Sequence, residues 1–119
     1  MKIGACESQT ETALGSSKYF NAEAESSSWY LASDYCPYNP FLCTWNHVYN
    51  PYCTQDIHTG QITEKEVNNT NTWGLYFAGH NVFEAILDEL EVQSNSLLDA
   101  TDIILSGCSA GGLGVWPNL

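Results

Sequence analysis

Positive charge is scarce in this sequence of 119 residues, which has three lysines and arginines against fourteen aspartates and glutamates. The formal net charge at pH 7 is −11. Proteins that hold nucleic acid neutralise its phosphates with lysine and arginine, so the composition argues against nucleic acid as a partner. The acidity favours solubility and carries no information about the fold.

The sequence also lacks an apolar run long enough to span a membrane, a heptad pattern and an internal repeat. Residues 1–6 are not followed by the apolar segment of a signal peptide. Either the start of the protein is missing, or the chain is not exported. We therefore expect no membrane span and no structure built from repeated units.

Five cysteines are many for a chain of this size, and none of their spacings is the Cys-x-x-Cys that is typical of zinc sites. Cys36, Cys43 and Cys53 lie close together among tyrosines, prolines and asparagines. We predict disulfides formed in an oxidising compartment, with one cysteine unpaired or paired outside the chain. The glycosylation sequon at residues 68–70 agrees with a secreted protein.

Aromatic residues are concentrated in residues 29–60, between prolines and cysteines. Within this region residues 45–49 have the composition of a strand, and the Asn-Pro pairs at 39–40 and 50–51 mark turns. The aromatic side chains either line a cleft for a sugar or lipid, or cover a loop-rich surface held by disulfides. Residues 1–28 are mostly small and polar, and we expect loops there with one short helical turn.

The chain is 44% hydrophobic, which suffices for one small domain with one core. Its clearest helix is expected over about residues 79–93, because apolar residues recur there with helical spacing. These residues are Val82, Phe83, Ile86, Leu87 and Leu90. Residues 102–105 are typical of a buried parallel strand, so this half of the chain is interpreted as an α/β unit.

That strand leads into Gly107-Cys108-Ser109-Ala110-Gly111, which has the Gly-x-Ser-x-Gly spacing of the nucleophile elbow in serine hydrolases. Such a serine sits on a strained turn, often with positive φ, and side chains two positions to either side would collide with the turn. Ser109 is the candidate nucleophile, and the N–H of Ala110 is a candidate donor to the oxyanion. A Gly-rich strand-to-helix turn with an unreactive serine fits the local pattern equally well.

A serine nucleophile needs a base, usually histidine, and a carboxylate that orients the base. His47, His58 and His80 all precede Ser109, whereas in α/β hydrolases the acid and the histidine follow the serine. No Asp, Glu or His follows Ser109. We expect structural roles for the three histidines, and the Asp56-x-His58 pair is too weak a pattern for a metal site.

Residues 105–114 resemble the nucleophile motif of the pectin acetylesterase/Notum family. Upstream segments are similar to motifs of this family and follow one another in the same order. These segments are residues 39–41, 45–48, 52–53, 56–60, 77–79 and 98–100. The resemblance covers roughly residues 29–114. Several ordered motifs make it more specific than the elbow alone.

The resemblance implies a Ser-Asp-His triad that cleaves carboxylic esters without a metal or another cofactor. Ser109 matches the family's nucleophile and Ala110 matches a donor to the oxyanion, while the family's Asp and His are expected beyond the end of this sequence. Further donors come from a Gly-Gly-Trp segment followed by cysteine, to which Gly4-Ala5-Cys6 corresponds here. Gly4 is therefore a candidate donor, although Ala5 replaces the Trp and the cysteine expected shortly after Cys6 is absent.

The resemblance also implies an α/β-hydrolase-like fold, and we interpret residues 1–119 as a single, incomplete domain of this kind, truncated at its C-terminus. An α/β hydrolase usually needs about 200 residues or more. Without the acid and base, the chain by itself is expected to be nearly inactive, because losing a triad member costs on the order of 10⁴ in rate.

The implied substrate is an acetylated cell-wall polysaccharide outside the cell or, as in Notum, a fatty acyl ester on a protein. Two other classes stay open. One is another Gly-x-Ser-x-Gly hydrolase, such as a lipase or a peptidase. The other is a non-catalytic protein that binds carbohydrate through its aromatic region.

Overall fold

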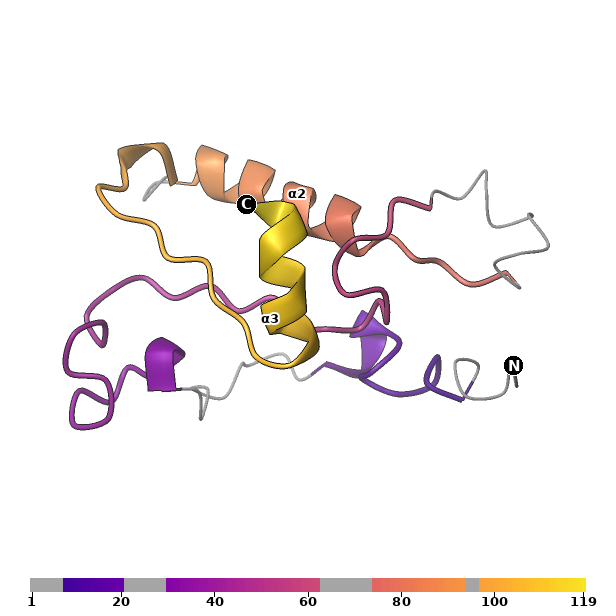
Figure 1. Cartoon of the computed structure of the whole chain (residues 1–119), viewed down its shortest axis with the longest axis horizontal. Coiled ribbons are helices and arrows are strands. Elements are labelled where there is room, and N and C mark those ends of the chain that lie inside the picture. The colour runs from indigo at the N-terminus through magenta and orange to yellow at the C-terminus, as the bar shows by residue number, and fades with distance from the viewer. Residues whose placement is uncertain (1–7, 21–29, 63–73, 94–96) are drawn as a thin grey trace.

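The computed structural model describes residues 8–20, 30–62, 74–93 and 97–119. In these ranges the α-helices are α2 (Gly79–Val92) and α3 (Ala110–Val115). Short 3₁₀ turns accompany them, namely η1 (Ser17–Tyr19), η2 (Tyr30–Ala32), η3 (Leu97–Asp99) and η4 (Trp116–Asn118). Figure 1 shows α3 in the middle of the molecule, with the C-terminus beside α2.

The helix predicted over about residues 79–93 is confirmed as α2. Its apolar residues recur three and four positions apart, which places them on one side of the helix. Part of this side, together with Val48, lines an open groove of about 410 Å³. The helical residues of the groove are Val82, Ala85, Ile86, Glu89 and Leu90, followed by Gln93.

The parallel strand predicted over residues 102–105 is absent, because no described segment forms a β-strand. Ile103 and Ile104 are 64% and 55% exposed, so the predicted burial is also wrong for this chain. A helix makes its hydrogen bonds internally, whereas a strand exists only through a ladder with a neighbour. No described segment provides that neighbour, nor one for residues 45–49, which are not a strand either. The α/β-hydrolase-like fold therefore stays a prediction.

The single core that the composition predicts is also missing from the described part of the chain, where no hydrophobic side chain is fully buried. The radius of gyration is 16.1 Å. A compact domain of this length would have a radius of gyration of roughly 13–14 Å. An apolar face becomes a core only when a second layer covers it. Here α2 and the extended residues 102–107 present apolar side chains that no described layer covers.

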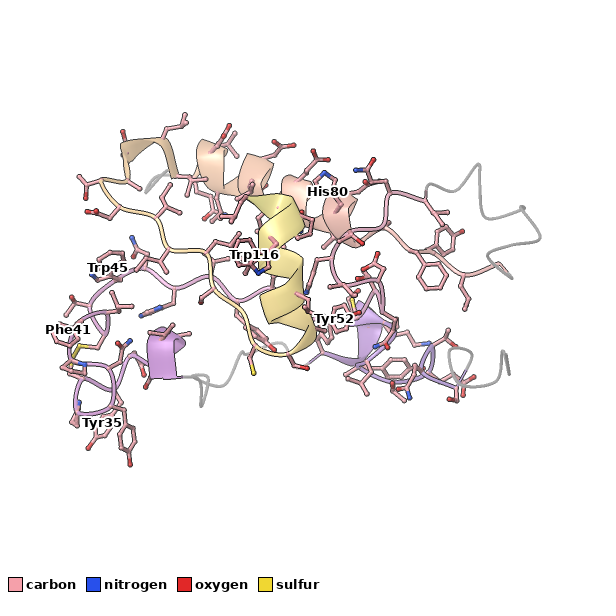
Figure 2. The ribbon with its side chains drawn as sticks, in the orientation of Figure 1. Tyr35, Phe41, Trp45, Tyr52, His80 and Trp116 are labelled. Carbon is pink, nitrogen blue, oxygen red and sulfur yellow. A yellow bond between two sulfur atoms is a disulfide. The ribbon has the colours of Figure 1, made fainter. Side chains whose placement is uncertain are left out.

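A disulfide joins Cys36 to Cys43, which confirms a disulfide in the aromatic region. The buried Asn39 side chain organises the enclosed loop, donating from Nδ2 to the carbonyls of Leu31 and Ser33 at 3.1 and 2.9 Å. Large side chains on this loop face outward, with Tyr38 68% and Phe41 86% exposed. The labelled Tyr35, Phe41 and Trp45 gather at one end of the molecule in Figure 2. This arrangement favours the interpretation as a disulfide-held surface.

Candidate functional site

Ser109 lies at the point where the extended segment turns into α3. Its φ and ψ are 53° and −120°, outside the regions that residues with a side chain ordinarily adopt. This matches the positive φ expected at the elbow. Ser109 precedes the first residue of α3, and its side chain makes no capping hydrogen bond. Its hydroxyl is therefore left available at an exposed turn.

Ala110 is the first residue of α3, and its backbone N–H points out of the start of the helix. The next N–H, of Gly111, is already engaged, because it donates to the Cys108 carbonyl at 2.9 Å. The first N–H groups of a helix have no partner within the helix and are available to an anion. The geometry thus leaves the Ala110 N–H as a donor immediately beside the Ser109 hydroxyl.

The two elbow glycines differ in what surrounds them. A Cβ on Gly107 would collide with the Gly111 carbonyl and come within 2.7 Å of the Gly112 nitrogen, so only glycine fits there. A Cβ on Gly111 would meet no described atom within 4 Å. The predicted steric need for glycine is therefore found at Gly107 and not at Gly111. The reason is that Gly107 lies against the backbone of α3, whereas Gly111 turns its hydrogens outward.

The second predicted donor to the oxyanion, Gly4, lies outside the described residues, as do Ala5 and Cys6. The sequon at residues 68–70 lies outside them too. The role of Gly4 therefore stays a prediction from the resemblance alone.

Residues 54–60 form a loop, here called the Asp56 loop, in which the sequence predicted no site residue. The Asp56 carboxylate accepts hydrogen bonds through both oxygens. Oδ1 accepts from the Thr54 hydroxyl at 2.5 Å and the His58 N–H at 3.0 Å. Oδ2 accepts from the Gly60 N–H at 3.1 Å and the Gly79 N–H at 2.7 Å. The carboxylate thereby joins its own loop to the first residue of α2.

The Asp56 loop also contacts α3 and η4. Asn118 donates from Nδ2 to the carbonyls of His58 and Gly114, at 3.0 and 2.7 Å. Gly114 is buried, and a Cβ there would come within 2.8 Å of the Ile57 carbonyl oxygen. The backbone of α3 therefore lies directly against the Asp56 loop, five residues after Ser109.

The three histidines have surroundings that fit structural roles. His47 is exposed, and the His58 ring lies 4.9 Å from the Tyr52 ring. His80 Nδ1 is 2.7 Å from Asn118 Oδ1, and its Nε2 is 3.3 Å from Glu84 Oε1. Because the Asn118 Nδ2 donates elsewhere, its Oδ1 must accept, so Nδ1 of His80 carries a hydrogen.

No histidine in the described ranges forms a hydrogen bond with the Ser109 hydroxyl. The contacts of this part of the chain therefore do not identify a base for Ser109.

Two further cysteines, Cys53 and Cys108, are free thiols. Burial raises the pKa of the Cys53 thiol, and the nearby Asp56 charge adds to this, while a backbone hydrogen bond acts in the opposite direction. The described residues contain no group of three or more His, Cys, Asp or Glu side chains that would hold a metal ion. Among them there is also no helix with the length and apolar content that crossing a membrane requires.

Neither Asp56 nor Asn118 was predicted from the sequence to organise this region. One local signal was available for Asp56. The residue before α2 is Ala78, which has no side-chain oxygen to cap the helix, so a capping group had to come from elsewhere. No local signal identifies Asn118, because the two partners that connect it to the rest of the molecule, His58 and His80, lie 60 and 38 residues away in the chain.

The amino-acid sequence was compared with models of known protein families. The model of the pectinacetylesterase family matches residues 1–119. The chain belongs to the pectinacetylesterase family. This confirms the resemblance that the ordered motifs predicted, and places the Gly107–Gly111 turn and the Asp56 loop within a family sequence.

Relatives in plants and animals agree with this assignment. The chain is 39% identical over 111 residues to pectin acetylesterase 5 of Arabidopsis thaliana, covering 93% of this chain and 24% of that protein. It is 33% identical over 116 residues to the palmitoleoyl-protein carboxylesterase NOTUM of Schmidtea mediterranea, covering 96% of this chain and 20% of that protein. With pectin acetylesterase 4 of Arabidopsis thaliana it shares 37% identity over 93% of this chain and 25% of that protein.

The chain thus spans about a quarter or less of the length of these relatives. No solved structure matches it.

Proposed function

We propose that this chain carries the nucleophile of a carboxylic ester hydrolase resembling pectin acetylesterases. The observation that carries the proposal is the backbone of Ser109, whose φ of 53° at the start of α3 fits a nucleophile elbow. The chain's membership of the pectinacetylesterase family supports the same function.

In the proposed reaction the Ser109 Oγ attacks the carbonyl carbon of the ester, and its proton passes to a base. The tetrahedral oxyanion accepts a hydrogen bond from the Ala110 N–H and from a second donor in the Gly4 region. The C–O bond to the alcohol then breaks, the alcohol takes the proton from the base, and an acyl group remains on Ser109. Water, deprotonated by the same base, attacks the acyl group, and release of the carboxylic acid restores the serine.

The base and the carboxylate that orients it are proposed to come from sequence C-terminal to Ser109, as in other α/β hydrolases. The engagement of His58 with the Tyr52 ring, and of His80 with Asn118 and Glu84, supports this assignment. Residues 1–119 would then contribute the nucleophile and the oxyanion donors but not the proton transfers.

The proposed substrate is an acetyl ester on a polysaccharide. We propose that the reaction takes place outside the cell, in an oxidising compartment. The names of the Arabidopsis relatives support the acetyl group, and the Cys36–Cys43 disulfide supports the compartment. A second candidate is removal of a longer acyl group, because NOTUM of Schmidtea mediterranea matches 96% of the chain. The net charge of −11 disfavours tight binding of a polyanion, so neutral acetylated polysaccharides belong among the substrates tested.

The test is ester hydrolysis by the protein expressed from its complete reading frame. We expect release of acetate from acetylated pectin or neutral acetylated polysaccharide, and faster cleavage of p-nitrophenyl acetate than of p-nitrophenyl palmitate. Ser109→Ala should lower kcat by on the order of 10⁴. The exposed Ser106 provides a matched control, because Ser106→Ala makes the same chemical change three residues away.

Retention of turnover in Ser109→Ala would contradict the proposed nucleophile. Faster cleavage of the long-chain ester would instead favour the second candidate. Binding of polysaccharide without any hydrolysis would favour a non-catalytic binding protein.

A further inference from the structure

We propose that Asp56 is a positioning residue for the nucleophile elbow, acting through the Asp56 loop on α3 and so on Ser109. This inference rests on the proposed function, because it assigns a role in catalysis to a residue that lies outside the elbow. Asp56 touches neither Ser109 nor α3 in the described contacts. Its effect must therefore travel through the loop.

The first link is the shape of the loop. Gln55, Ile57 and His58 have φ values of 56°, 60° and 57°, a left-handed conformation that is unfavourable for residues with a side chain. It is least favourable for the β-branched Ile57. Such conformations persist only where the surroundings hold them in place.

Asp56 supplies much of that restraint. Its Oδ1 accepts from the N–H of His58, and its Oδ2 accepts from the N–H of Gly60, so the carboxylate spans the strained stretch. The Tyr52 hydroxyl adds a further contact by accepting from the Ile57 N–H at 2.8 Å. Without the carboxylate, the N–H groups of His58 and Gly60 would lose these acceptors, and the loop could relax toward ordinary backbone angles.

The second link fixes the loop against α2. Asp56 Oδ2 accepts from the Gly79 N–H, which is the first N–H of a helix that lacks its own capping side chain. A carboxylate at this end also complements the positive end of the helix dipole. The Gly60 carbonyl accepts from the His80 N–H at 3.0 Å, on the same side. These hydrogen bonds fix the Asp56 loop to the start of α2.

The third link carries the position of the loop to α3. The Ile57 carbonyl faces the Gly114 backbone so closely that no Cβ fits between them. Asn118 holds the His58 carbonyl and the Gly114 carbonyl with one amide group. Since α3 contains only the residues from Ala110 to Val115, a shift at Gly114 is a shift of the whole helix and of the turn that begins it. Small displacements of a reacting group can cost as much as about 100-fold in rate.

The competing explanation is that Asp56 only caps α2 and has no effect on the position of Ser109. Kinetic measurements separate these two explanations. The experiment compares Asp56→Asn with Asp88→Asn, a matched change at an exposed carboxylate on α2, in the protein expressed from its complete reading frame. Both are assayed with p-nitrophenyl acetate at a temperature where circular dichroism shows each variant folded. We expect Asp56→Asn to lower kcat by about 10- to 100-fold with KM nearly unchanged, and Asp88→Asn to leave both unchanged. Unchanged kcat in folded Asp56→Asn would overturn the inference.

A double-mutant cycle of Asp56→Asn with Asn118→Ala tests whether Asp56 acts through the contact between its loop and α3. If Asp56 acts through the contact of its loop with α3, the two substitutions will not add, and Asp56→Asn will cost little kcat once Asn118 is alanine. Additive losses in kcat would show that Asp56 does not act through this contact. Should Asp56→Asn not fold, Gly114→Ala takes its place, since the added Cβ separates α3 from the Ile57 carbonyl. Full kcat in folded Gly114→Ala would equally overturn the inference.

The unaltered protein and Ser109→Ala are assayed alongside. Absence of Ser109-dependent turnover in the unaltered protein would remove the proposed function, and this inference with it. Ser109-dependent turnover with full kcat in Asp56→Asn would remove this inference alone.

Discussion

At the scale of single residues, the two elbow glycines give opposite predictions. Gly107→Ala forces a Cβ against the Gly111 carbonyl, and we expect it to lower the free energy of unfolding by about 1–3 kcal/mol. Gly111→Ala meets open space in a helix, where alanine is favoured over glycine by about 0.4–1 kcal/mol. Urea denaturation of both variants in the complete protein measures the difference. Equal losses in the two variants would contradict the packing described for Gly107.

The free thiols provide a second test at this scale. The thiolate is the reactive form of cysteine, and the pKa of Cys53 is raised, chiefly by burial. Cys108 is exposed. With iodoacetamide near pH 8 and without reductant, we expect Cys108 to be alkylated before Cys53, and Cys36 and Cys43 to stay unmodified until their disulfide is reduced. Peptide mass spectrometry follows each site, and faster alkylation of Cys53 would show that its burial is wrongly described.

At the scale of elements, the Asp56 carboxylate caps the start of α2, so we expect Asp56→Asn to lower the stability of this region. Asp56→Asn keeps one carbonyl oxygen but places an NH₂ group against N–H donors, so at least one partly buried N–H loses its acceptor. The expected cost is about 1–3 kcal/mol of unfolding free energy. Amide hydrogen exchange should rise at Gly60 and Gly79 if the NH₂ group takes the place of Oδ2, or at His58 if it takes the place of Oδ1. Exchange that matches the unaltered protein at all three amides would contradict the hydrogen bonds described for Asp56.

The same scale shows what the sequence could and could not predict. The helix α2 was predictable because its hydrogen bonds are internal and because apolar residues recur with helical spacing within residues 79–92. The strand at residues 102–105 was not, because an apolar run becomes a strand only beside another strand. The positive φ of Ser109 followed from the elbow pattern. That of Ile57 did not, because a β-branched residue is the last that sequence reasoning would place there.

At the scale of the whole molecule, the elbow and the Asp56 loop lie together although the described residues form no hydrophobic core. Large apolar side chains such as Ile103, Leu113 and Trp116 are exposed by 64%, 61% and 78%. The chain also covers a quarter or less of the relatives whose family it shares. The Asn118 and Asp56 hydrogen bonds, rather than buried apolar area, tie the Asp56 loop to α3 and α2. Family membership was predictable from ordered motifs, whereas this polar framework needed the structure.

A fluorophosphonate probe tests whether Ser109 is an activated nucleophile. Such a probe phosphonylates a serine that a base has activated, with loss of fluoride, and leaves ordinary hydroxyls unmodified. We predict one equivalent of label on the complete protein, located on Ser109 by peptide mass spectrometry and absent from Ser109→Ala. Label on another serine, or no label on a folded protein, would contradict the account.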